Sequence, residues 1–97
     1  MPVEFSCTFN FLKIVWDEPK RLANLEKHGL DFADVVHFGW EDAFILVARD
    51  GRFKAIGRLE DGTAVVIYAL LGSEAISIVS FRPAGTLERK LFRDHKA

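Results

Sequence analysis

Short runs rich in apolar residues, separated by turn residues, follow one another in the C-terminal half of the chain, which predicts four β-strands. They span residues 44–49, 52–59, 64–71 and 75–81. Asp50-Gly51 and Asp61-Gly62 are typical of two-residue hairpin turns, and Gly72-Ser73 supplies the third turn. Such short turns join antiparallel neighbours, so an antiparallel sheet is expected, with the nearly all-apolar stretch 64–71 at its centre.

The first fifteen residues are also predicted to be extended. Four apolar residues share one parity there, which suits a half-buried strand: Phe5, Cys7, Phe9 and Phe11. Asp17-Glu18-Pro19 then favours a helix start, because acidic residues suit the positive N-terminal end and proline fits a first turn. This helix is expected to run to about His28 and to stop at Gly29.

Two further helices complete the pattern. Asp31 is the expected N-cap of a short second helix whose inward side consists of Phe32, Val35 and Val36. Pro83 ends the last strand, and Thr86 is the expected N-cap of a final helix with an apolar stripe of Leu87, Leu91 and Phe92. The predicted fold class is α+β, an antiparallel sheet of four to five strands with two N-terminal helices and one C-terminal helix packed on one face.

Composition narrows the class of protein. A chain of 97 residues predicts one domain, and 49% hydrophobic residues with a net charge of -1 exclude an intrinsically disordered chain. Cys7 is the only cysteine, which excludes a disulfide framework and a Cys-rich zinc site. The sequence has no long uncharged apolar run and no signal-peptide pattern, so a cytoplasmic protein is expected.

The first predicted helix carries polar residues along one face. Measured from Trp16 at about 100° per residue, they lie between about 20° and 80°, opposite the apolar Leu22 and Leu25. This polar stripe consists of Lys20, Asn24 and Lys27, with His28 at its edge. Two cations and an amide donor on one face can hold a phosphate or a carboxylate, and an ordinary solvent-exposed face is the alternative.

Two further candidates for contact with a ligand, Trp16 and Arg58, also have a structural alternative. Trp16 can stack on a base, but a tryptophan at a helix start is more often a core anchor, and we favour the anchor. Arg58, late in the strand 52–59, is a further candidate cation. Its alternative is a cross-strand ion pair with a neighbour.

A second cluster lies where the last strand meets the last helix. Residues 82–97 carry five basic and two acidic residues, and such a local basic patch can bind a phosphate. On charge alone, the favoured alternative is a solvated amphipathic helix. Arg82 can clamp a phosphate bidentately, and Glu88, in the first helical turn, can act as a general base if it is partly buried. The alternative, which the residues alone favour, is a salt bridge between the two that fixes the helix to the sheet.

Other familiar chemistry is not indicated. None of the four serines stands in a nucleophile-elbow context, and no glycine-rich phosphate loop is present. The three histidines, His28, His37 and His95, are too scattered to suggest metal ligation. Any chemistry is therefore expected to use neither a metal nor a bound cofactor.

Three ordered motifs follow one another along the chain. The opening motif is Trp16-Asp17-Glu18-Pro19-Lys20, then Asn24, then Lys27-His28-Gly29-Leu30, with Phe32 following. The middle motif is Ala55-Ile56-Gly57-Arg58, and the closing motif is Ile78-Val79-Ser80-Phe81-Arg82-Pro83-Ala84 with Glu88 beyond it. These motifs resemble those of the BrnT family, and the resemblance covers about residues 14–93, nearly the whole chain.

The resemblance implies the toxin of a bacterial type II toxin–antitoxin pair, with a RelE-like fold and a metal-independent ribonuclease activity that inhibits translation. It implies RNA as the substrate, and neither a cofactor nor a membrane is expected. The implied partner is a BrnA-like ribbon-helix-helix antitoxin, and the toxin is expected to reach operator DNA only through this antitoxin. The chain is then one BrnT-like domain, 1–97, whose residues 1–13 extend beyond the usual family start. These residues are either an added strand or the result of a generous choice of start codon.

Metal-free RNA cleavage needs deprotonation of the 2′-hydroxyl, stabilisation of the phosphorane charge and protonation of the leaving 5′-oxygen. The candidates for charge stabilisation are Arg82, Lys20 and Lys27. The candidates for proton transfer are Glu88 and His28, the second because histidine titrates near neutrality. Further candidates for RNA or phosphate contact are Asn24, Arg58 and Trp16.

Two other functions stay open. One is a non-catalytic toxin-fold binding module that pairs with a DNA-binding antitoxin and modulates transcription. The family often has a tyrosine four residues after the closing glutamate, where this chain has Phe92, and this substitution favours the binding module modestly. The other is a structural domain in which all three motifs serve packing and turns.

Overall fold

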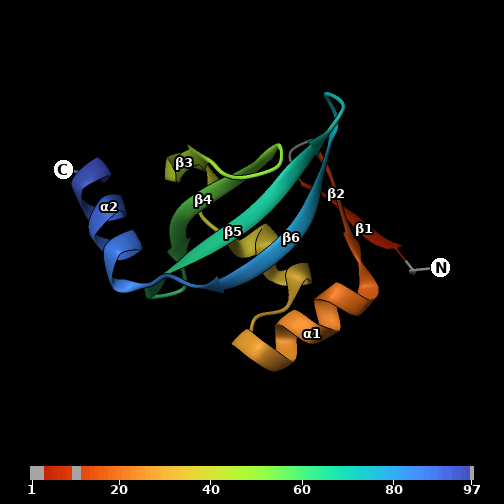
Figure 1. The fold of residues 1–97 in the computed structure, drawn as a ribbon, viewed down its shortest axis with the longest axis horizontal. Coiled ribbons are helices and arrows are strands. Elements are labelled where there is room, and N and C mark those ends of the chain that lie inside the picture. The colour runs from red at the N-terminus through yellow and green to blue at the C-terminus, as the bar shows by residue number, and fades with distance from the viewer. Residues whose placement is uncertain (1–3, 10–11, 97) are drawn as a thin grey trace.

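The computed structural model describes residues 4–9 and 12–96, which form a six-stranded sheet in the order β1-β2-β6-β5-β4-β3 (Figure 1). The strands are β1 (Glu4–Phe9), β2 (Leu12–Asp17), β3 (Phe44–Val47), β4 (Arg52–Leu59), β5 (Gly62–Leu71) and β6 (Ala75–Pro83). The helices are α1 (Glu18–His28), α2 (Thr86–Lys96) and the two 3₁₀ helices η1 (Phe32–His37) and η2 (Trp40–Asp42). No helix in this part of the chain is long and apolar enough to cross a membrane.

The sheet is mixed, so the prediction of a purely antiparallel sheet of four to five strands is wrong. β2 pairs in parallel with β6, with Ile14 opposite Ile76 and Trp16 opposite Ile78, whereas the other strand pairs are antiparallel. Hairpin turns reveal only which consecutive strands are neighbours. The place of β2 is set by a contact between distant parts of the chain. Of the predicted N-terminal strand, Phe11 lies outside the described residues.

The predicted second N-terminal helix is a 3₁₀ helix rather than an α-helix. Its bonds run from residue i+3 to residue i, as in Asp34 N–H to the Asp31 carbonyl at 2.9 Å, and the predicted Asp31 cap accepts from Ala33 N–H at 2.9 Å. In this geometry residues three apart lie one above the other. Phe32 and Val35 are therefore both fully buried.

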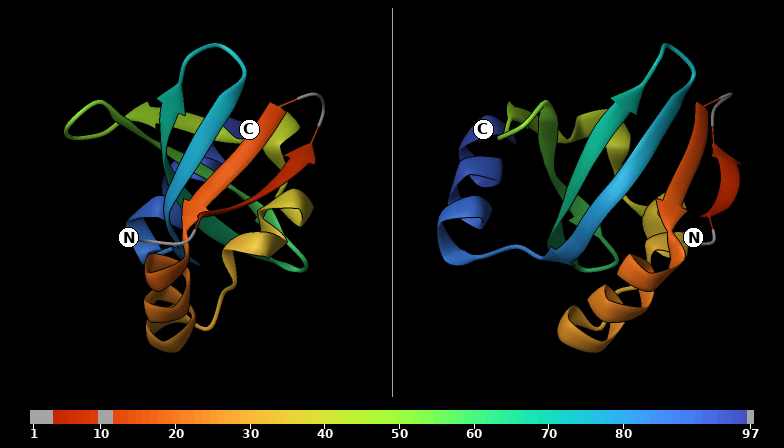
Figure 2. Two further views of the ribbon diagram at one scale, coloured as in Figure 1. Left: turned by 90° about the vertical axis from the view of Figure 1, so that its right-hand side faces the viewer. Right: turned by 45° about the vertical axis from the view of Figure 1, so that its right-hand side comes forward.

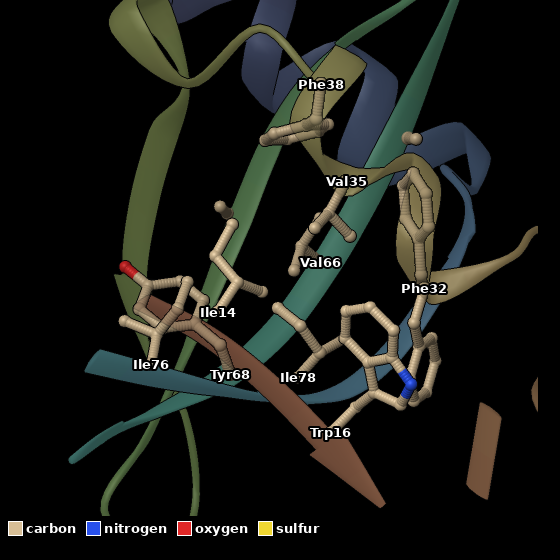
Figure 3. Close-up of a cluster of buried hydrophobic side chains, with 12 residues drawn as sticks. Ile14, Trp16, Phe32, Val35, Phe38, Val66, Tyr68, Ile76 and Ile78 are labelled. Atoms are coloured by element: carbon tan, nitrogen blue, oxygen red, sulfur yellow. The ribbon is translucent and has the colours of Figure 1, made fainter. Parts of the chain in front are cut away.

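Helical segments cover both faces of the sheet, not one as predicted. η1 packs on one face, over a core that includes Trp16, Phe32 and Ile78 (Figure 3). α2 packs on the other face, against β3 and β4, and buries Phe92 with Ile56, Val65 and Ala84 (Figure 2). The two clusters alternate along the strands because successive side chains point to opposite faces.

One turn, one helix start and one apolar position differ from the sequence pattern. The β4–β5 turn consists of Glu60-Asp61, because Gly62 already pairs with Leu59. Thr86 is the first residue of α2 rather than its cap, and Leu87 is 67% exposed, so it does not belong to the apolar stripe.

Gly57 has to be a glycine because Phe38 and Gly39, which follow η1, lie close to β4. A Cβ atom at this position would lie 2.7 Å from the Phe38 ring and 3.1 Å from the Gly39 carbonyl oxygen. This part of the middle motif therefore serves packing. Gly29 has a different role, since its φ of 75° allows its N–H to cap α1 by bonding the Leu25 carbonyl.

Asn24 joins α1 to the sheet. Its Oδ1 accepts from Phe81 N–H at 3.2 Å, and its Nδ2 donates to the Phe81 carbonyl at 2.6 Å and to the Leu30 carbonyl at 3.0 Å. The side-chain amide thus pairs with β6 as another strand would, beyond the point where β2 leaves the sheet. The solvent-exposed face predicted for Asn24 is wrong, because the residue is only 8% exposed.

The orientation of α1 is correspondingly reversed from the prediction. Leu22 is 52% exposed and Leu25 is 37% exposed, although both were expected to be buried. The buried amide, not an apolar stripe, sets which side of the helix faces the sheet, because an unpaired Phe81 N–H and carbonyl would cost more than two exposed leucines gain by burial.

We predict that Asn24→Ala lowers the free energy of unfolding by about 2–4 kcal/mol, because it leaves buried backbone groups of β6 without partners. Urea unfolding at pH 7 measures this change. Leu22→Ala, on the same helix but exposed, is the matched control and should change the free energy by less than about 0.5 kcal/mol. A larger loss in Leu22→Ala than in Asn24→Ala would contradict this account of how α1 is held.

Candidate functional site

Two cations and one carboxylate converge where β6 ends and α2 begins. Arg82, near the end of β6, donates from Nη1 to Glu88 Oε1 and from Nη2 to Glu88 Oε2, both at 2.7 Å. Lys54 of β4 donates from Nζ to Oε2 at 2.9 Å, and the Gly85 N–H donates to Oε1 at 2.8 Å. Each carboxylate oxygen therefore accepts two hydrogen bonds. We call Arg82, Lys54 and Glu88 the cation cluster.

Sheet register brings the two cations together. Arg82 lies opposite Val65 and Lys54 lies opposite Ile67, so only β5 separates them, and both project from the face that α2 covers. Glu88 reaches this face from the first turn of α2 and bonds the N–H of Gly85, three residues earlier. This bond is half of a capping box, which explains a glutamate at the third helical position.

The charges of the cation cluster reinforce one another. The Arg82 guanidinium, with smaller contributions from the Gly85 N–H and Lys54, holds the pKa of Glu88 far below its usual range, against the opposing effect of burial. Glu88 in turn raises the pKa of Arg82. Glu88 and Arg82 therefore both stay ionised at neutral pH. A carboxylate with so low a pKa is a poor general base while it keeps these partners.

The cation cluster can bind an anion. The side chains of Arg82 and Lys54 are 28% and 29% exposed, whereas that of Glu88 is 13% exposed, so solvent reaches the cations more readily than the carboxylate. A guanidinium and an ammonium side by side match the oxygens of a phosphate group.

The predicted salt bridge between Arg82 and Glu88 is confirmed. Lys54 was missed, because its partner Glu88 lies on α2, 34 residues later in the chain. The signal that could have found it is parity, since Arg52, Lys54 and Arg58 share a strand face with the buried Ile56. Cations that share a strand face with a core residue indicate an acidic partner on the element that covers this face.

The other predicted site residues lie elsewhere. Trp16 is 6% exposed and serves as the core anchor, with its indole Nε1 donating to Glu18 at 3.3 Å. Lys20 and Lys27 are exposed on α1, and His28 is half-buried at its end. Among the described residues, no hydrogen bond or ion pair connects these three with the cation cluster.

Arg58 is exposed on β4, on the same side as Lys54 but about 13 Å farther along the strand. The cross-strand ion pair considered for it is not formed, because its partner on β5 is Thr63. Arg58 instead lies near Asp42 and helps Lys96 to lower the pKa of that carboxyl. The structure thus brings Arg82, Glu88 and Lys54 together and leaves Arg58 apart from them.

A cavity and the possible metal ligands were also compared with the cation cluster as candidate sites. A cavity of about 410 Å³ lies on the η1 side, lined by Leu30, Asp34, His37, Leu59 and Glu60. Within residues 4–9 and 12–96, no three His, Cys, Asp or Glu side chains are placed to hold a metal ion. The cation cluster is therefore the arrangement with the clearest chemical character.

Comparisons with known proteins place the chain in a family. Residues 16–88 match the family model of the ribonuclease toxin BrnT of type II toxin–antitoxin systems. The chain belongs to the BrnT family. The matched segment contains all three residues of the cation cluster, whereas β1 precedes it.

A solved structure supports the same assignment. The chain is 38% identical to the Brucella abortus ribonuclease toxin BrnT, with a TM-score of 0.66, over 81% of this chain and 100% of that one. No curated protein matches the sequence. A toxin of a type II system has an antitoxin as its partner, so an antitoxin is expected for this BrnT family member as well.

Phe92 occupies the position where the family often has a tyrosine. Its ring is 6% exposed and packs with Ile56, Val65 and Ala84 beneath α2. The apolar ring here stabilises the packing of α2 on the sheet. In this BrnT family member the aromatic position therefore has a core role.

We predict that the Glu88 carboxylate stabilises the fold in a pH-dependent way. Its low native pKa stabilises the fold fully above the ordinary glutamate pKa of 4.5, and this contribution is lost progressively as the pH falls from that value through the much lower native pKa. Glu88→Gln should therefore lower the free energy of unfolding by about 1–3 kcal/mol at pH 7 and by less at pH 3.

Urea unfolding at the two pH values measures the difference. Asp94→Asn is the matched control, because Asp94 pairs with Lys90 on the exposed side of the same helix. That substitution should leave the free energy of unfolding nearly unchanged at either pH. An equal deficit of Glu88→Gln at pH 7 and pH 3 would contradict the assigned role of the ion pair.

Proposed function

We propose that this chain is a metal-independent endoribonuclease that inhibits translation, and that a BrnA-like ribbon-helix-helix antitoxin neutralises it and connects it to operator DNA. Membership of a family of ribonuclease toxins supports the reaction class. The observation that carries the proposal for the site is the convergence of Arg82 and Lys54 on one carboxylate. We also propose that 1–97 is one domain in which the N-terminal extension adds β1.

In this proposal Arg82 and Lys54 stabilise the negative charge that develops on the phosphorane when the 2′-oxygen attacks phosphorus. Fixed cations are effective in this role because they need no rearrangement as the charge forms. Glu88 acts first as a positioning residue, since its two oxygens hold both cations on the α2 face.

Proton transfer is assigned to one of two groups. Glu88 is adjacent to the phosphate position, but its pKa is too low for it to take a proton while Arg82 and Lys54 bind it. His28 carries an imidazole, a common general base, and its helix is fixed to β6 through Asn24, whose partner Phe81 precedes Arg82. The pH–rate profiles of the wild type and of His28→Gln distinguish the two, because a histidine base gives a limb that this substitution removes.

Lys20, Lys27 and Arg58 are proposed to guide the rest of the RNA rather than its scissile phosphate. All three are exposed, and they lie on α1 and β4, away from Lys54 and Glu88. Each should contribute to affinity through a phosphate contact and so to its salt dependence. We do not propose a contact with RNA for Trp16 or Asn24, because both side chains are buried.

Expression of the chain in bacteria tests the proposed function. We predict arrested growth and fragmented RNA, and recovery when the DNA-binding protein encoded beside it is co-expressed. Growth curves and RNA integrity on the same cultures measure both effects. Tight association with that protein but intact RNA would support the non-catalytic binding module instead.

We predict that Arg82→Ala lowers the rate of RNA cleavage by purified protein by about 30- to 1000-fold, which corresponds to about 2–4 kcal/mol of transition-state stabilisation. The matched control is Arg93→Ala, which removes an exposed cation from α2 and should keep nearly the full rate. Melting temperatures of both variants establish the folded fraction. If Arg82→Ala keeps its specific activity and only melts earlier, Arg82 serves the fold alone.

A further inference from the structure

The cation cluster is an anion site that already contains an anion. Four donors surround the carboxylate of Glu88: Arg82 Nη1 and Nη2, Lys54 Nζ and the Gly85 N–H, at 2.7–2.9 Å. A phosphate group uses the same kind of donors, namely a bidentate guanidinium, an ammonium and a backbone N–H near a helix start.

We propose that a phosphate group enters this site by exchange with Glu88, so that the free protein keeps its own phosphate site closed with its own carboxylate. The ligand class is a phosphodiester of a nucleic acid, for which inorganic phosphate is the minimal probe. The inference rests on the proposed function, and it adds a step that precedes the reaction.

Replacement of Glu88 by a phosphate uses the available donors better than binding of a phosphate beside Glu88 would. Both terminal nitrogens of Arg82 already bind Glu88, and this edge of the guanidinium is the one that grips two oxygens at once. A phosphate placed beside the intact cluster would lie next to a carboxylate of like charge at short range, which costs free energy. Replacement of one anion by another leaves no cation without a partner.

The position of Glu88 allows it to leave. Glu88 lies in the first turn of α2, and the helix is held independently by the burial of Phe92 and by the Lys96–Asp42 ion pair at its other end. Rotation of one glutamate side chain therefore opens the site without unfolding α2. In place of the capping bond, the Gly85 N–H is then free to bind a phosphate oxygen.

Exchange also connects the binding of the substrate with the basicity of the Glu88 carboxylate. The pKa of Glu88 is held low chiefly by Arg82. Once a phosphate binds Arg82 and Lys54, the displaced carboxylate regains a pKa near that of an ordinary glutamate and becomes a better proton acceptor. A group that is inert in the free protein thus becomes available when the substrate is in place.

Binding of inorganic phosphate to the purified full chain tests the proposal. Calorimetric titration at pH 7 and constant ionic strength should show binding at least tenfold tighter for Glu88→Ala than for the wild type. Glu88→Gln, which removes the charge but keeps an acceptor for Gly85, should also bind more tightly and is the variant to use if Glu88→Ala does not fold. Asp94→Asn removes one charge from the same helix and should bind as the wild type does.

The location of the phosphate is tested by the double variant Glu88→Gln with Arg82→Ala, which should lose the gained affinity. Equal affinity of the wild type and both Glu88 variants overturns the proposal, as does a gain that survives the loss of Arg82. RNA cleavage is measured separately. Gained phosphate affinity in a protein that leaves RNA intact supports the exchange and contradicts only the proposed ribonuclease function.

Discussion

The side-chain amide of Asn24 is the interaction on which the arrangement of this molecule depends. β2 stops pairing with β6 at Trp16, and the next residues of β6 would then present bare backbone groups to α1. Asn24 pairs with both the N–H and the carbonyl of Phe81, across 57 residues of sequence. This pairing extends the hydrogen bonding of β6 to Phe81, the residue before Arg82. The backbone that carries Arg82 is therefore fixed by α1.

The sequence patterns that predicted the fold correctly are local ones. The β3–β4 hairpin follows from Asp50-Gly51, because both residues adopt the positive φ that their turn requires, 58° and 72°. The end of α1 at Gly29 follows from the same kind of reasoning. Local patterns do not predict the parallel pairing of β2 with β6 or the helical segments on both faces of the sheet. No local signal encodes contacts between residues about 60 positions apart.

The site was predictable to the extent that its residues are close in sequence. Arg82 and Glu88 lie six residues apart at a strand–helix junction, and this spacing suggested their ion pair. Lys54 is brought in by strand register, which depends on the whole sheet. Asn24 was placed in solvent because a polar residue on a helix normally is; only the unpaired edge of β6 explains its burial, and that edge exists only once the sheet is assembled.

The same ion pairs serve stability and set a limit on function. With Glu88 in place, the cation cluster carries a net charge of only +1, in a chain whose overall net charge is -1, so the folded protein has little long-range attraction for a polyanion. In the proposed function, recognition of RNA then depends on short-range contacts that compete with Glu88 for its donors. Because the ring of Phe92 is buried beneath α2, those contacts rest on Arg82 and Lys54, and the strength with which Glu88 binds the two cations sets how readily a phosphate can replace it.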